Sequence, residues 1–168
     1  KGLFDLLFLA DSLSVAKDSH PNILTRFEPL TLLSYLASAT SNIGLVSTAS
    51  TTYEEPFNVA RKFASLDHIT SGRAGWNVVT TSLASTAVNF NKSEHLEHGL
   101  RYKRATEFVE VTKKLWDSWE DDTLVIDKET GQFIDESKFH EINHQGEFFS
   151  VKGPLNISRS PQGHPVIV

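Results

Sequence analysis

The stretch SLDHITSGRAGWNVVTT, residues 65–81, decides the fold because it joins the end of a helix to a short buried strand. Apolar residues at helical spacing lead to Gly72, a typical helix terminator, and the segment WNVVTT that follows is typical of a strand. We expect Gly72 and Gly75 to let the chain turn tightly into this strand. Polar side chains then gather at the strand's far end, at Asn77, Thr80 and Thr81.

The segments before this stretch repeat the same alternation. The apolar runs at residues 2–10 and 43–50 are predicted to be buried strands, the first of them covered on both faces. Helices are predicted over residues 30–39, just after Pro29, and over residues 54–70, with Pro56 in the first turn. Each predicted strand ends in hydroxyl or carboxylate residues.

The segment after this stretch contains the longest helical pattern of the chain. A long amphipathic helix is expected within residues 95–121, with one apolar stripe formed by Phe108, Val111, Leu115 and Trp119. Residues 121–163 change to short alternating pieces with Gly and Pro, which indicate an inserted hairpin region before a last strand in HPVIV. The order of elements predicts an α/β fold with parallel strands and right-handed crossovers.

Composition limits the classes of function. With 168 residues, 39% hydrophobic and 22% charged, the chain is predicted to be one soluble globular domain, residues 1–168. The net charge of −5 and the scattered basic residues argue against nucleic acid as a partner. The chain has no cysteine, no apolar run long enough for a membrane span and no signal-peptide pattern, so we expect a cytoplasmic location. Both ends look cut, which suggests an internal piece of a longer protein.

Polar residues at the ends of parallel strands are candidates for ligand binding, because ligands of α/β proteins sit at those ends. Asp11 follows the first predicted strand, Thr48 ends the second, and Asn77 and Thr80 lie on the third. The same residue types are usual at helix caps and turns, so a structural role remains an alternative for each. His98 and Tyr102, four residues apart, project from one face of the long helix, where a solvated helix face is the alternative to phosphate binding.

Several segments resemble, in order, the bacterial luciferase-like flavin monooxygenases, in the branch of nitrilotriacetate and dibenzothiophene-sulfone monooxygenases. They are GLFDLLFLADS, SLDHITSGRAGWNVVTT, NF at residues 89–90, RYKRATEFVEVTKKLWDSWEDD and GPLNISRSPQGHPVIV. The resemblance implies an incomplete N-terminal portion of a TIM (β/α)₈ barrel, about strands 2 to 5. Such barrels need about 250 residues, so the sheet edges of this piece should be exposed.

The resemblance also implies a cofactor and partners. Reduced FMN is expected at the mouth of the barrel, where Asp11, Thr48, His98 and Tyr102 match flavin-binding positions and Asn77 is a weaker candidate. A serine that touches the phosphate is expected just beyond HPVIV. Relatives insert one oxygen atom from O₂ into a small organic substrate through a peroxyflavin, and a separate NAD(P)H-dependent flavin reductase supplies FMNH₂. A homo-oligomer is expected, and no nucleophilic side chain is required.

Two alternatives to a monooxygenase remain. Residues 140–144, HEINH, fit the H-E-x-x-H pattern of zinc peptidases, in which two histidines one helical turn apart hold the metal. The Gly and alternating apolar residues that follow favour an extended strand over the required helix, and we therefore predict no metal. The other alternative is a family member that binds flavin without catalysis.

Overall fold

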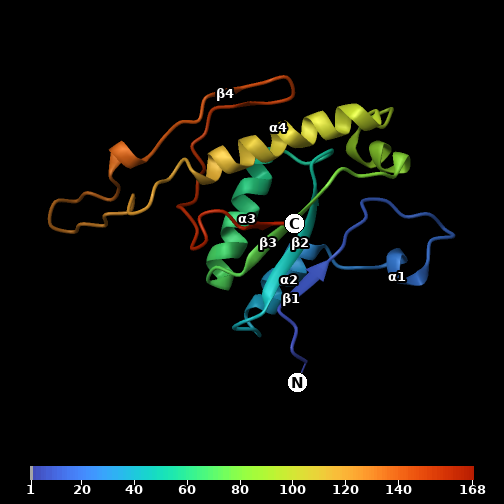
Figure 1. The fold of residues 1–168 in the computed structure, drawn as a ribbon, viewed down its shortest axis with the longest axis horizontal. Coiled ribbons are helices and arrows are strands. Elements are labelled where there is room, and N and C mark those ends of the chain that lie inside the picture. Colours follow the sequence, from blue (N-terminus) through green and yellow to red (C-terminus); the bar gives the residue numbers. More distant parts are fainter. Residues whose placement is uncertain (1) are drawn as a thin grey trace.

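The computed structural model describes residues 2–168, and its centre is a sheet of four parallel strands with helices packed against it (Figure 1). The strands lie in the order of the chain and pair only in parallel. They are β1 (Leu6–Leu9), β2 (Gly44–Ser50), β3 (Ala74–Val79) and β6 (Val166–Ile167). Helix α2 (Pro29–Ala37) connects β1 to β2, α3 (Pro56–Thr70) connects β2 to β3, and α4 (His98–Trp116) follows β3. The predicted α/β architecture with a parallel sheet is confirmed.

The smaller elements lie in the connections. A short helix α1 (Pro21–Leu24) precedes α2, and the 3₁₀ helix η1 (Ala84–Phe90) lies between β3 and α4. A second 3₁₀ helix, η2 (Glu136–Lys138), and the antiparallel pair β4 (His144–Gln145) and β5 (Ser150–Val151) lie between α4 and β6. Helix α4 lies across the end of the molecule toward which the strands run (Figure 1).

The helix boundaries follow the predicted signals, and one glycine acts differently from the prediction. Pro29 and Pro56 both occupy the first turn of their helices. Helix α3 ends in left-handed backbone at Ser71, with φ of 55°, and Gly72 follows with φ of 83°. Gly75 makes no turn, because it lies inside β3. A Cβ atom at this position would lie 2.9 Å from Cγ2 of Val46 on β2. Its absent side chain instead gives the neighbouring strand room.

Trp76 anchors the larger of two apolar cores. Its side chain is fully buried, its Nε1 donates to the Ala49 carbonyl at 3.1 Å, and its ring centroid lies 5.6 Å from that of Phe63. Phe108 and Trp116 of α4 complete this aromatic group. The second core joins α2, β2, α3 and the start of β3, through Leu33, Ala37, Leu45, Leu66 and Ala74.

Strand β1 is less buried than predicted. Leu7 and Leu9 pack against the second core, whereas Leu6 and Phe8 on the opposite face remain 50% and 44% exposed. The apolar run at residues 2–10 was expected from the sequence to be covered on both faces. Within the described residues 2–168 one face is uncovered, so this expectation is wrong. β1 is the edge strand of the sheet, and only the face that carries Leu7 and Leu9 packs against a core.

Residues 117–163 leave the sheet and return to it as an antiparallel excursion (Figure 1). Isolated bridges join Trp119 to Phe139 and Leu124 to Ile134. Helix α4 ends at Trp116, so Trp119 lies beyond it and is not part of the helix's buried stripe, which includes Phe108, Val111 and Leu115. An inserted region with boundaries at about 121 and 163 stays a prediction. None of the helices within residues 2–168 has the length and hydropathy of a membrane span.

A buried carboxylate fixes the start of β3 against the loop before β6. Asp67 near the end of α3 is fully buried, and its Oδ1 accepts from the Ala74 amide at 3.3 Å. The side-chain amide of Gln162 donates to the same Oδ1 at 2.6 Å, and the Gln162 backbone amide donates to Oδ2 at 2.9 Å. Asp67 thus joins three segments through both of its carboxylate oxygens.

We expect Asp67→Asn to lower the free energy of unfolding by about 2–3 kcal/mol, because an amide has one acceptor oxygen where the carboxylate uses two. The new NH₂ group would also face a Gln162 donor. Urea unfolding of both proteins measures the difference. Asp18→Asn, at an exposed carboxylate, is the matched control; equal effects of both variants would contradict the structural role of Asp67.

Candidate functional site

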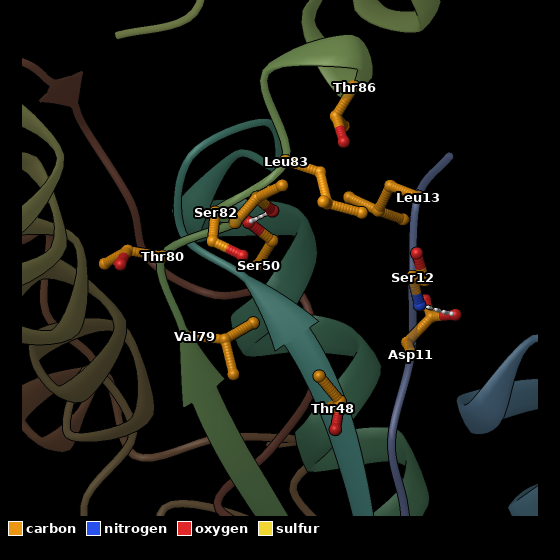
Figure 2. Close-up of a pocket in the computed structure, with 11 residues that line it drawn as sticks. Asp11, Ser12, Leu13, Thr48, Ser50, Val79, Thr80, Ser82, Leu83 and Thr86 are labelled. Carbon is orange, nitrogen blue, oxygen red and sulfur yellow. Dashed lines mark hydrogen bonds between the residues drawn. The ribbon is translucent and has the colours of Figure 1, made fainter. Parts of the chain in front are cut away.

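A cavity of about 220 Å³ lies at the carboxyl ends of β2 and β3, beside the segment that follows β1 (Figure 2). Its polar lining is made of short side chains, and Leu13, Val79 and Leu83 supply the apolar part. Figure 2 shows Leu13 and Leu83 pointing toward each other from two different segments. The lining residues are Asp11, Ser12, Leu13, Thr48, Ser50, Val79, Thr80, Thr81, Ser82, Leu83 and Thr86.

The polar groups at the strand ends are connected across the sheet. The Thr48 hydroxyl donates to the Leu9 carbonyl of β1 at 2.8 Å and accepts from Nδ2 of Asn77 on β3 at 3.0 Å. Both bonds are possible because the parallel pairing of the strands places Thr48 opposite Asn77 on β3 and next to β1. Asn77 therefore supports Thr48 from behind and is not among the residues that line the cavity.

Asp11 and Thr80 contribute differently from their predicted roles. Oδ1 of Asp11 accepts from the adjacent Ser12 amide at 2.8 Å, so one carboxylate oxygen is already bonded within the chain at the cavity edge (Figure 2). Thr80 is among the lining residues, but its side chain points away from Ser50 (Figure 2). Thr81 takes the inner position, where its hydroxyl bonds to that of Ser50 at 2.6 Å.

His98 and Tyr102 lie outside this cavity. Both are on the first turns of α4, on one face as predicted, with ring centroids 4.9 Å apart. Both side chains are exposed, and neither lines the cavity formed by Asp11 and Thr48. The structure of residues 2–168 therefore brings Asp11, Thr48 and Asn77 together and leaves the helix pair apart from them. Their joint role in flavin binding stays a prediction.

The cavity also contains residues that the sequence analysis did not select. Ser12, Ser50, Ser82 and Thr86 supply further hydroxyl groups. The first two directly extend the polar strand ends in LADS and VSTAS, so the same signal could have identified them. Thr86 could not be found in this way, because it belongs to η1 and not to a strand end. Its hydroxyl bonds to that of Ser14, in the segment after β1, at 3.2 Å.

A smaller recess of about 90 Å³ continues from the cavity past Asp11 and Thr48 to Glu28 and Lys62. Burial favours a raised pKa for Glu28, but hydrogen bonds from Thr31 and from the Leu30 amide outweigh it and lower the pKa. The nearby Lys62 ammonium acts in the same direction. Glu28 is thus a charged cap of α2 and not a proton donor to the cavity.

The HEINH segment serves as an attachment to α4. His144 lies on β4 in extended backbone, and its Nε2 contacts Oε1 of Glu107 at 3.0 Å. His140 instead pairs with Glu120, so the two imidazoles have different carboxylate partners and the helical spacing of a zinc motif is not formed. No group of three metal-binding side chains occurs within residues 2–168.

Glu107 holds the β4–β5 hairpin on α4 with three hydrogen bonds. Besides His144, the amides of Phe148 and Phe149 donate to its carboxylate at 3.0 and 2.9 Å. Burial raises the pKa of Glu107, but these bonds and the His144 contact outweigh burial, and the net pKa lies below the ordinary value of 4.5. The charged carboxylate is therefore the form that retains the hairpin.

We predict that acid releases this hairpin. Because the folded pKa of Glu107 is depressed, its contribution is complete above its unfolded pKa and is lost as pH falls through the folded value. Limited proteolysis between pH 7 and 3 should show cleavage near residues 146–149 rising at the acid end. Glu107→Gln should show that cleavage already at pH 7, whereas the exposed neighbour Glu147→Gln should match the wild type. The same cleavage near residues 146–149 in all three proteins at every pH would contradict the prediction.

Comparison with known proteins identifies the family of this chain. The sequence model of the family described as luciferase-like monooxygenase matches residues 4–168. The chain belongs to this family. Among curated relatives, N-acetyl-S-(2-succino)cysteine monooxygenase of Bacillus subtilis (strain 168) is 67% identical over all of this chain and 38% of the relative. Nitrilotriacetate monooxygenase component A of Aminobacter aminovorans is 52% identical over all of this chain and 40% of its own length. Dibenzothiophene-sulfone monooxygenase of Rhodococcus erythropolis is 46% identical, with coverage of 100% and 39%.

Solved structures of luciferase-like relatives have the same fold. The crystal structure of a long-chain alkane monooxygenase matches with a TM-score of 0.91 and 43% identity, over 98% of this chain and 40% of that one. A riboflavin lyase crystallised with modified FMN and riboflavin matches with a TM-score of 0.87 and 40% identity, over 97% and 38%. The chain thus spans about two fifths of the length of these relatives, and the predicted resemblance to this branch of the family is confirmed.

Proposed function

We propose that this chain is part of an FMN-dependent, two-component monooxygenase and forms about strands 2 to 5 of a (β/α)₈ barrel. The observation that carries the proposal is the polar cavity at the carboxyl ends of β2 and β3, where barrel enzymes bind their ligands. The sequential parallel order of the strands and the uncovered edge at β1 both suit one arc of such a barrel. Membership of the luciferase-like family supports the same proposal.

The cavity lining fits a flavin in kind but encloses only part of it. A flavin combines an apolar ring face with polar edges and a polyhydroxyl chain, and the cavity combines three aliphatic side chains with a row of hydroxyls. At about 220 Å³ the cavity is smaller than the roughly 300–1,000 Å³ of complete small-molecule sites. In the proposal, the remaining wall comes from the other part of the barrel.

Individual residues would hold the cofactor in different ways. Thr48 is already oriented by Leu9 and Asn77, so its position is fixed before any ligand binds. Oδ2 of Asp11 has no bond within residues 2–168 and would accept from a flavin N–H or hydroxyl group. His98 and Tyr102 would reach the phosphate end from α4. Leu13 and Leu83 would exclude water from the ring.

The reaction requires partners beyond this chain. Reduced flavin, when bound, supplies the electrons that activate O₂ for transfer of one oxygen atom to a small organic substrate. A separate NAD(P)H-dependent reductase would deliver FMNH₂, and the name "component A" of a relative supports a second component. We retain a homo-oligomer and a cytoplasmic location as expectations.

The proposal predicts that Asp11→Ala and His98→Ala each weaken reduced-FMN affinity of the complete protein about tenfold or more, the effect of one charge-assisted hydrogen bond. Anaerobic titration followed by flavin fluorescence measures the affinity. Asp18→Ala, at an exposed carboxylate away from the cavity, should bind like the wild type. Unchanged affinity in both site variants would disprove the assignment of these residues.

Turnover tests the activity itself. The complete protein with reduced FMN, O₂ and a flavin reductase should convert at least one member of a panel of aminocarboxylates, sulfones, thioethers and alkanes. Mass spectrometry with ¹⁸O₂ should find one labelled oxygen atom in the product. Tight flavin binding without any product would instead favour a non-catalytic flavin protein.

A further inference from the structure

A polar contact outside the cavity joins the connection that follows β2 to the connection that precedes α4. The hydroxyl of Tyr53 and Nδ1 of His95 are 2.6 Å apart. The Tyr53 ring also stacks on Phe90, with centroids 4.8 Å apart and planes 20° apart. Neither Tyr53 nor His95 lines the cavity beside Asp11 and Thr48.

This contact connects the end of β2 to the start of α4. Tyr53 lies three residues after the last residue of β2, in the connection to α3. His95 lies three residues before His98, in the connection from η1 to α4. Glu97 lies between them and caps the helix by accepting from the Leu100 amide at 3.1 Å. His95 is therefore two residues before the N-cap of α4.

The two side chains share one hydrogen bond, in which either atom can be the donor according to the tautomer of the imidazole. Burial raises the pKa of Tyr53 and nearby Arg101 opposes the rise only in part, so the phenol stays protonated. Nε2 of His95 is buried without a hydrogen-bond partner among residues 2–168. The bond to Tyr53 is thus the polar contact that fixes the ring, and its loss leaves Nδ1 without this partner.

One further contact stabilises the same arrangement. Nη2 of Arg104, on the second turn of α4, donates to the Glu54 carbonyl at 3.2 Å. Tyr53 and Glu54 are adjacent, so the connection after β2 contacts both His95, just before α4, and Arg104, on its second turn. His98 and Tyr102 lie between these two attachments.

We propose that Tyr53 and His95 are positioning residues. They hold the start of α4 so that His98 and Tyr102 can reach a flavin bound in the cavity beside Asp11 and Thr48. The inference rests on the proposed flavin function, and it assigns the hydrogen-bonded pair a role in cofactor affinity through the α4 residues. Neither side chain of the pair touches the cofactor itself.

The test uses the complete protein and anaerobic reduced-FMN titration. Tyr53→Phe keeps the stacked ring and removes the hydroxyl, and it should weaken affinity about fivefold, the usual effect of one buried hydrogen bond. His95→Leu should weaken it similarly, whereas His95→Asn, which retains an acceptor near Nδ1, should restore most of it. Tyr35→Phe is the matched control, because Tyr35 is 75% exposed on α2.

A double-mutant cycle separates positioning from a general loss of stability. If Tyr53 acts through His98 and Tyr102, adding Tyr53→Phe to a His98→Ala/Tyr102→Phe variant should cause less than a twofold further loss of affinity. A full fivefold loss in that background, or wild-type affinity of Tyr53→Phe, would overturn the inference. A wild-type protein that does not bind reduced FMN would overturn the proposed function first, before any variant is compared.

Discussion

The buried carboxylate of Asp67 is the constraint on which the sheet depends, because it sets where two neighbouring strands begin. Its oxygens hold the first residue of β3 and the loop before β6, and Gln162 returns a bond to the Ala74 carbonyl at 2.9 Å. Parallel strands have no tight hairpin to fix their register, so side chains of the connections must do so. With the start of β3 fixed, Thr48 lies opposite Asn77 and their side chains meet at the other end of the sheet.

The sequence predicted those parts of the fold that depend on local chemistry. Pro29, Pro56 and Gly72 mark helix ends through their own backbone preferences. Gly75 was assigned to a turn because its real reason, the approach of Val46 from β2, depends on strand pairing. The exposure of Phe8 was missed for a related reason, since an apolar pattern does not reveal whether a second layer is present.

The candidate site shows the same division between local and distant information. Polar strand ends pointed to Asp11 and Thr48, which line the cavity, whereas the pairing of Ser50 with Thr81 depends on the register of β2 and β3. The HEINH pattern by itself could not decide between a helix and a strand, because five matching letters carry no information about backbone conformation. Glu107 lies 37 residues before His144 and gives that histidine its partner, a contact that no spacing rule contains.

The rim of the cavity is held by side chains and not by a continued sheet. Asn89 donates to the Leu13 carbonyl at 3.0 Å, Ser14 bonds to Ser85 and Thr86, and Tyr53 bonds to His95. Each of these bonds joins the connection after one strand to a segment between β3 and α4. Substitutions at such contacts can alter the rim without altering strand pairing, because the sheet is fixed separately by Asp67 and the Trp76 core. The fold therefore separates the part that must stay constant from the part that decides what binds.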